Sequence, residues 1–127
     1  MTRRAMSKMF SALAVSILAF TSACTKPVDA TYKELSWKDD VFFLNDKPFT
    51  GTAHETHPNG KPSKEYPMVD GRIHGLMHEW WENGQMSAET HFMHGKRHGL
   101  NRYWNTEGKL IKEQVYENGE SKSVRTF

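Results

Sequence analysis

Glycine recurs along this chain at a fixed interval of 24 residues. Three glycine ladders and one glutamate column keep this interval: Gly60, Gly84 and Gly108; Gly71, Gly95 and Gly119; Gly51, Gly75 and Gly99; and Glu65, Glu89 and Glu113. An unrelated, loop-rich chain would not keep four ladders at one period. The sequence therefore predicts three copies of a 24-residue repeat, at 49–72, 73–96 and 97–120.

Each copy contains two turn signals between segments that suit β-strands. Asn83-Gly84 marks one turn and Asp70-Gly71 marks the other. Such dipeptides tolerate positive φ at both central residues of a type I′ turn, whose twist matches that of the flanking strands. We expect two tight turns of this kind per copy and a continuous antiparallel meander.

Side chains alternate between the two faces of a strand, and this alternation divides the aromatic residues. Trp80 and Trp104 share one parity, whereas Trp81 and Tyr103 have the other. We expect the face of Trp80 and Trp104 to supply the core and Trp81 and Tyr103 to be partly exposed. Trp81, Tyr103 and the neighbouring Glu79 are the candidate partner-binding residues, because exposed aromatic residues often anchor interfaces.

The repeat resembles the variant MORN repeat, through the pattern G-x-x-x-x-[WY]-x-x-N-G-[KQ] followed by Glu and x-G-[KR]. The resemblance covers residues 32–120, and the stretches ENGQ and HGKRHG carry it most clearly. Bacterial proteins of this type are grouped as the YwqK-like antitoxin family. The resemblance implies an all-β fold, an elongated twisted antiparallel sheet of stacked β-hairpins. In the first copy, Pro62 and Pro67 each lack a ladder donor, so we expect part of it to be an edge or irregular.

The N-terminal segment resembles a bacterial lipoprotein signal peptide. A basic region precedes an apolar helical core at 9–20, which is too short to span a bilayer permanently, and small residues lead to the only cysteine, Cys24. Residues 1–23 are thus a predicted signal peptide, and Cys24 is the predicted lipid attachment site. An ordinary signal peptide with a stray thiol is the alternative. Thr25, which follows the cysteine, implies an outer membrane-anchored lipoprotein that faces the periplasm.

The remaining segments flank the repeats. Residues 24–31 are a predicted tether, residues 32–48 a degenerate capping hairpin, and residues 121–127 a C-terminal tail. The full chain has 17 Lys and Arg against 15 Asp and Glu, and loss of the three cations in residues 1–23 leaves 14 against 15. This balance offers no basic patch for nucleic acid, so no nucleic-acid partner is expected.

No catalytic or metal-binding set stands out. The seven histidines recur because the repeat recurs: His74 and His98 are one period apart, and no spacing matches a metal site. The glutamate column is expected to pair with lysines such as Lys61 and Lys109 on a solvated face. The chain contains no nucleophile elbow, phosphate loop or zinc motif, so we expect no enzyme activity, cofactor or metal.

These observations predict a non-enzymatic, lipid-anchored repeat module for protein–protein interaction or scaffolding at the bacterial cell envelope. The membrane contact is made through the lipidated cysteine, and the protein partner is unidentified. The alternative, implied by the resemblance, is an antitoxin that binds its toxin directly, and lipid-surface binding by the repeats is a third possibility. The sheet edge at residues 111–120 is a further candidate for strand addition, because open edges are templates for pairing.

Overall fold

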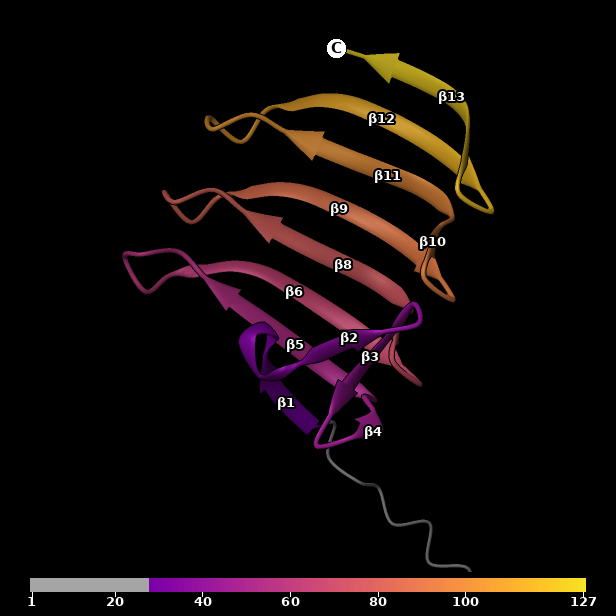
Figure 1. Ribbon diagram of the computed structural model, residues 1–127. Coiled ribbons are helices and arrows are strands. Elements are labelled where there is room, and N and C mark those ends of the chain that lie inside the picture. The colour runs from indigo at the N-terminus through magenta and orange to yellow at the C-terminus, as the bar shows by residue number, and fades with distance from the viewer. Residues whose placement is uncertain (1–27) are drawn as a thin grey trace, which may run out of the picture.

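The computed structural model describes residues 28–127, which form an all-β protein of two sheets (Figure 1). The predicted signal peptide at 1–23 and the predicted lipid site at Cys24 lie outside the described residues. The elements are β1 (Val28–Thr31), the 3₁₀ turn η1 (Tyr32–Glu34), β2 (Ser36–Lys38), β3 (Val41–Leu44), β4 (Lys47–Pro48), β5 (Gly51–Thr56), β6 (Pro62–Val69), β7 (Arg72–Ile73), β8 (Gly75–Trp80), β9 (Met86–Met93), β10 (Lys96–Arg97), β11 (Gly99–Trp104), β12 (Leu110–Glu117) and β13 (Glu120–Thr126). Within this range no helix has the length and apolar character needed to span a bilayer.

The large sheet has ten strands and is an antiparallel stack of hairpins. Its order is β1-β5-β6-β8-β9-β11-β12-β13, with the short strands β7 and β10 paired to β6 and β9. The three repeat hairpins β5–β6, β8–β9 and β11–β12 each join a six-residue strand to an eight-residue strand. The prediction of stacked antiparallel hairpins is therefore confirmed. One pairing departs from it, because β1 runs parallel to β5.

One of the two predicted turn types is confirmed. Asp70 and Gly71 both have positive φ, at 48° and 74°, and the equivalent turns at His94-Gly95 and Asn118-Gly119 match them. This is the conformation that a type I′ turn requires. The Asp39-Asp40 and Asn45-Asp46 turns of the N-terminal segment also have positive φ at both residues.

The other turn type is not I′, so that prediction is wrong. In these loops only the glycine, for example Gly84 with φ 88°, has positive φ. Trp81 N–H donates to the Gln85 carbonyl, Gly84 N–H donates to the Trp81 carbonyl, and the Asn83 side chain accepts the Gln85 N–H at 3.0 Å. This local bond of the asparagine holds a longer loop, which replaces the two-residue turn.

Side chains at these loops join each repeat to the next. The His57 ring Nε2–H donates to the Trp80 carbonyl at 2.8 Å, and one repeat later the Trp81 indole Nε1–H donates to the Trp104 carbonyl at 3.1 Å. The Asn83 side chain likewise donates to the Thr106 carbonyl at 2.7 Å. Trp81 therefore has a structural role in addition to any role in binding.

Residues 32–48, which we call the N-terminal cover, lie across one face of the large sheet, in front of β5 and β6 in Figure 1. We call this face the front face and the opposite one the back face. The main cluster of buried apolar residues lies here: Ala30, Phe49, Ala53, Tyr66, Met68 and Met77, against which Tyr32, Leu35, Phe42 and Leu44 pack. The Tyr32 and Tyr66 rings stack with 4.9 Å between centroids. Residues 32–48 thus include the predicted hairpin, β2–β3, which forms a separate sheet with β4.

The covered face is the opposite of the one predicted. Cross-strand register pairs Ala53 with Tyr66 and Ala88 with Tyr103, so Tyr103 and the buried cluster share the front face. Trp80 and Trp104 have the other parity and are only half-buried. Alternation along a strand distinguishes two faces but does not say which of them a distant segment will cover.

The prolines of the first copy do not disrupt it, contrary to expectation. β6 runs unbroken from Pro62 to Val69 between β5 and β8. Pro62 begins the strand at a register shift. The Pro67 carbonyl accepts from His74 N–H, so its backbone points toward β8, where regular β6–β8 pairing has already ended at Glu65↔His78. No ladder donor is needed there.

Both ends of the described chain are strands. Residues 28–31, predicted as tether, form β1, and residues 121–126 of the predicted tail belong to β13. β13 pairs with β12 along its length and covers the edge at 111–120 that the sequence had suggested for strand addition. The open edge at this end of the sheet is therefore β13.

Candidate functional site

A depression on the front face brings the three predicted partner-binding residues together. We call it the Trp81 groove; its volume is about 480 Å³, and its lining is Glu79, Trp81, Ser87, Ala88, Tyr103, Trp104, Ile111, Lys112 and Thr126. It forms where β8, β9, β11, β12 and β13 run side by side beyond the reach of the N-terminal sheet (Figure 1). The register that sets Glu79 opposite Ala88, Ala88 opposite Tyr103, and Tyr103 opposite Lys112 creates it.

The chemistry of the Trp81 groove is aromatic, with a cation over one of the rings. The Lys112 ammonium lies 3.9 Å from the Tyr103 ring centroid, within the range of a cation–π interaction. Trp81 is 39% exposed although its indole N–H is bonded, so its ring face is available. The Glu79 carboxylate is 3.8 Å from Lys64 Nζ at the rim. Sequence reasoning missed Lys112 and Thr126, which cross-strand register alone brings beside Tyr103.

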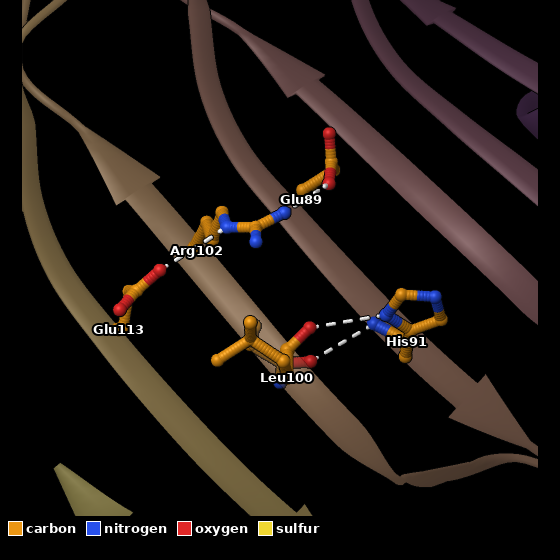
Figure 2. Close-up of polar contacts among 6 residues, drawn as sticks. Glu89, His91, Leu100, Arg102 and Glu113 are labelled. Carbon is orange, nitrogen blue, oxygen red and sulfur yellow. Dashed lines mark hydrogen bonds and ion pairs between the residues drawn. The ribbon is translucent and has the colours of Figure 1, made fainter.

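The back face carries a row of ionisable side chains in which glutamates alternate with histidines or arginines, with one member on each of the strands β5, β6, β8, β9, β11, β12 and β13. We call it the charged row; in strand order it consists of His54, Glu65, His78, Glu89, Arg102, Glu113 and Arg125. Figure 2 shows Arg102 between Glu89 and Glu113, with nitrogen–oxygen distances of 3.7 and 3.2 Å. His78 Nδ1 is 3.9 Å from Glu65, and His54 Nε2 is 3.6 Å from Asp29 of β1.

The glutamate column thus has different partners from those predicted. Glu65, Glu89 and Glu113 lie beside histidine and arginine, and neither Lys61 nor Lys109 forms an ion pair within residues 28–127. Both lysines are in the loops, beyond the strand pairs that the register brings face to face. The position of a residue in the repeat therefore determines which side chains it lines up with across the sheet. Its ion-pair partner depends on the residue that the neighbouring strand places opposite it.

The histidines that cluster near the turns have structural roles. The rings of His74 and His94 lie 4.8 Å apart, and His74 Nδ1 accepts the His94 backbone N–H at 3.3 Å. His91 Nδ1–H donates to the Leu100 carbonyl at 3.0 Å (Figure 2). In the part of the chain that the structure describes, no group of three or more His, Cys, Asp or Glu residues is placed to hold a metal ion.

Tyr66 has the one strongly perturbed ionisation near the core. Burial raises the pKa of its phenol well above the ordinary value of 10.0, and the 2.7 Å hydrogen bond that it donates to Glu55 adds to the effect. At the surface, the Thr31 backbone N–H and hydroxyl donate to Glu34 and lower the pKa of that carboxyl. Neither group lines the Trp81 groove.

The chain matches no protein-family model, no curated protein sequence and no solved structure.

Proposed function

We propose that this protein is a non-enzymatic interaction module of the bacterial cell envelope, and that its Trp81 groove binds a protein partner. In this proposal the lipidated Cys24 anchors the module to the outer membrane, and its stacked hairpins are a MORN-like repeat. The sequence of the N-terminal segment and the 24-residue period support these two parts.

The observation that carries the proposal is the uncovered aromatic part of the front face. The N-terminal sheet buries Tyr66 and Met77 but does not cover Trp81 or Tyr103. Protein interfaces are enriched in tryptophan, tyrosine and arginine anchors, and a cation beside an aromatic ring adds directionality. The groove is shallow and is bordered by Glu79 and Lys112, a surface suited to another protein.

The repeat itself supplies the variant that separates binding from folding. His57 is the equivalent of Trp81 one repeat earlier, and its ring makes the same hydrogen bond to the following repeat. A Trp81→His protein should therefore keep this bond while losing the large indole face. Trp37→His is the matched control, because Trp37 is 57% exposed and lies on β2, outside the groove.

The test is a crosslinking pull-down from membranes with four proteins: native, Cys24→Ala, Trp81→His and Trp37→His. We expect native protein and Trp37→His to capture the same partner, Trp81→His to lose it, and Cys24→Ala to leave the membrane fraction. Equal capture by Trp81→His would refute the groove as the binding site. Binding of the Cys24→Ala protein to protein-free lipid vesicles would support lipid-surface binding in its place, and a captured toxin would identify the module as an antitoxin.

A further inference from the structure

The charged row is incomplete at its last member. Each earlier basic side chain of the row has a carboxylate within 4.0 Å: His54 has Asp29, His78 has Glu65, and Arg102 has both Glu89 and Glu113. Arg125 is opposite Glu113 in the register, but Glu113 is held by Arg102. Among residues 28–127 no carboxylate pairs with Arg125, whose guanidinium lies 5.8 Å from the Phe127 ring centroid.

The strand that carries Arg125 is the open edge of the sheet. All seven residues of β13 are exposed, and within residues 28–127 only β12 pairs with it. Phe127 N–H donates to the Ile111 carbonyl of β12, so the backbone groups of Arg125 also point to β12. Those of Val124 and Thr126 alternate with them and point away from the sheet, where an added strand would meet them.

We propose that this edge docks an extended segment of a partner protein, which adds to β13 as an antiparallel strand with a carboxylate beside Arg125. In the interior of the sheet, β8 with His78 and β11 with Arg102 each lie between two strands that carry a glutamate of the row. β13 has one such neighbour, β12, and the partner supplies the second. Backbone hydrogen bonds to Val124 and Thr126 would provide the affinity, and the ion pair between Arg125 and the carboxylate of the partner would fix the register of the added strand.

Charge favours an acidic partner over a second copy of this chain. The one carboxylate of β13, Glu120, is already 3.0 Å from Lys122 Nζ, so a second β13 strand brings no free acid to Arg125. The register shift at Val115/Tyr116 places Lys122 at a bulge, and lysines and bulges are devices that prevent edge strands from pairing with themselves. The regular part of the edge is residues 123–126.

The experiment uses a synthetic peptide that copies β12, LIKEQVYE, which is the strand that follows a cation strand in the native sheet. Labelled protein is titrated with this peptide and followed by NMR. We expect the amides of Val124 and Thr126 to shift and to gain protection from hydrogen exchange. A Glu113→Lys peptide should bind at least about fivefold more weakly than the native peptide. This ratio corresponds to the loss of one opposite-charge cross-strand pair whose energy lies near the upper end of the usual range for such pairs.

A charge exchange distinguishes a specific pair from general attraction. An Arg125→Glu protein should lose affinity for the native peptide and regain it for the Glu113→Lys peptide, whereas Arg72→Glu, the same charge change outside β13, should bind the native peptide as the parent protein does. Equal binding by Arg125→Glu and the parent would overturn the proposal, as would shifts confined to residues outside β13. A sedimentation result showing dimers held through β13 would assign the edge to a second copy. The Trp81 groove shares Thr126 with this edge, but Trp81 itself lies outside β13. Trp81→His should therefore bind this peptide normally even where partner capture fails.

Discussion

Asn101 is a buried polar residue whose role can be tested by exchanging one repeat position for another. Its side chain is 0% exposed, and its Oδ1 accepts the His91 backbone N–H at 2.9 Å. The equivalent residues one repeat earlier are Met77 and Pro67. Proline has no N–H, so Met77 needs no acceptor at that place. At this place in the repeat, one copy thus satisfies the backbone N–H with the Asn101 side chain, and the earlier copy has no N–H to satisfy because it carries Pro67 beside Met77.

The energy of this bond follows from the cost of an unpaired amide. Asn101→Met leaves the His91 N–H, which is part-buried, without its acceptor, at a cost of up to about 1–3 kcal/mol. The same change removes the Asn101 Nδ2 group, which is buried and lacks a partner among the described residues, so the net loss for the single variant is smaller. Adding His91→Pro removes the orphaned donor. The coupling between the two changes should therefore be about 1–3 kcal/mol in the stabilising direction.

The assay is urea unfolding of four proteins: native, Asn101→Met, His91→Pro, and the double variant. The double-mutant cycle removes terms that belong to one site alone, including the loss of the His91 ring bond to the Leu100 carbonyl. We expect the double variant to be more stable than the sum of the single effects predicts. A coupling below about 0.5 kcal/mol, the usual limit of additivity, would refute the hydrogen-bond account of Asn101.

Two further predictions concern the N-terminal cover. The pKa of Tyr66 is raised in the folded protein above its unfolded value of 10.0, so the stabilising effect of the protonated phenol is fully present below pH 10 and is lost above pH 10, by up to about 1.4 kcal/mol per pH unit. In urea unfolding between pH 9 and about 11, the free energy of unfolding should therefore decline more steeply for native protein than for Tyr66→Phe. Parallel curves for the two proteins would contradict this prediction. Gly71→Ala should lower the free energy of unfolding by roughly 1–3 kcal/mol more than Gly84→Ala in the same assay. Both glycines have positive φ, but only a Cβ at Gly71 would meet Val41 Cγ1 and the Phe42 carbonyl, at 2.3 and 2.6 Å. Equal losses would show that the β2–β3 hairpin moves away from the added methyl group without cost.

The repeat period predicted the large sheet because each copy determines its own hairpin. Positive φ at Asp70-Gly71 and at its equivalents follows from residues that lie next to each other in the sequence. The loop at Gly84 was predicted wrongly because the Asn83 side chain, which suits a two-residue turn, instead bonds the Gln85 N–H. The prediction of which face is covered was wrong because residues 32–48, which lie outside the repeats, fold back onto the front face. That packing depends on Tyr32, which stacks on Tyr66 and which the 24-residue period does not relate to it.

The candidate site was predictable to the extent that parity and register determine it. Trp81, Tyr103 and Glu79 share one parity on strands that the repeat makes neighbours, and the structure gathers all three in one groove. Lys112 and Thr126 required the actual cross-strand register, which includes a shift between Tyr103 and Trp104. Arg125, which is unpaired among the described residues, could not be foreseen, because the sequence did not show that Glu120–Thr126 forms a strand.

The order of the hairpins also determines how the protein responds to force. Val28 lies at one end of the stack and Phe127 at the other, so tension between the two ends acts across the strands rather than along them (Figure 1). Hydrogen bonds between neighbouring strands are then loaded a few at a time. The end strands β1 and β13 each pair with one neighbour in the described sheet, so we expect opening to begin at the ends, and the loop bonds such as Trp81 to Trp104 mark the steps between repeats. If the module is held at its N-terminus and pulled through β13, its strands should separate one after another, and the end-to-end distance should increase in steps.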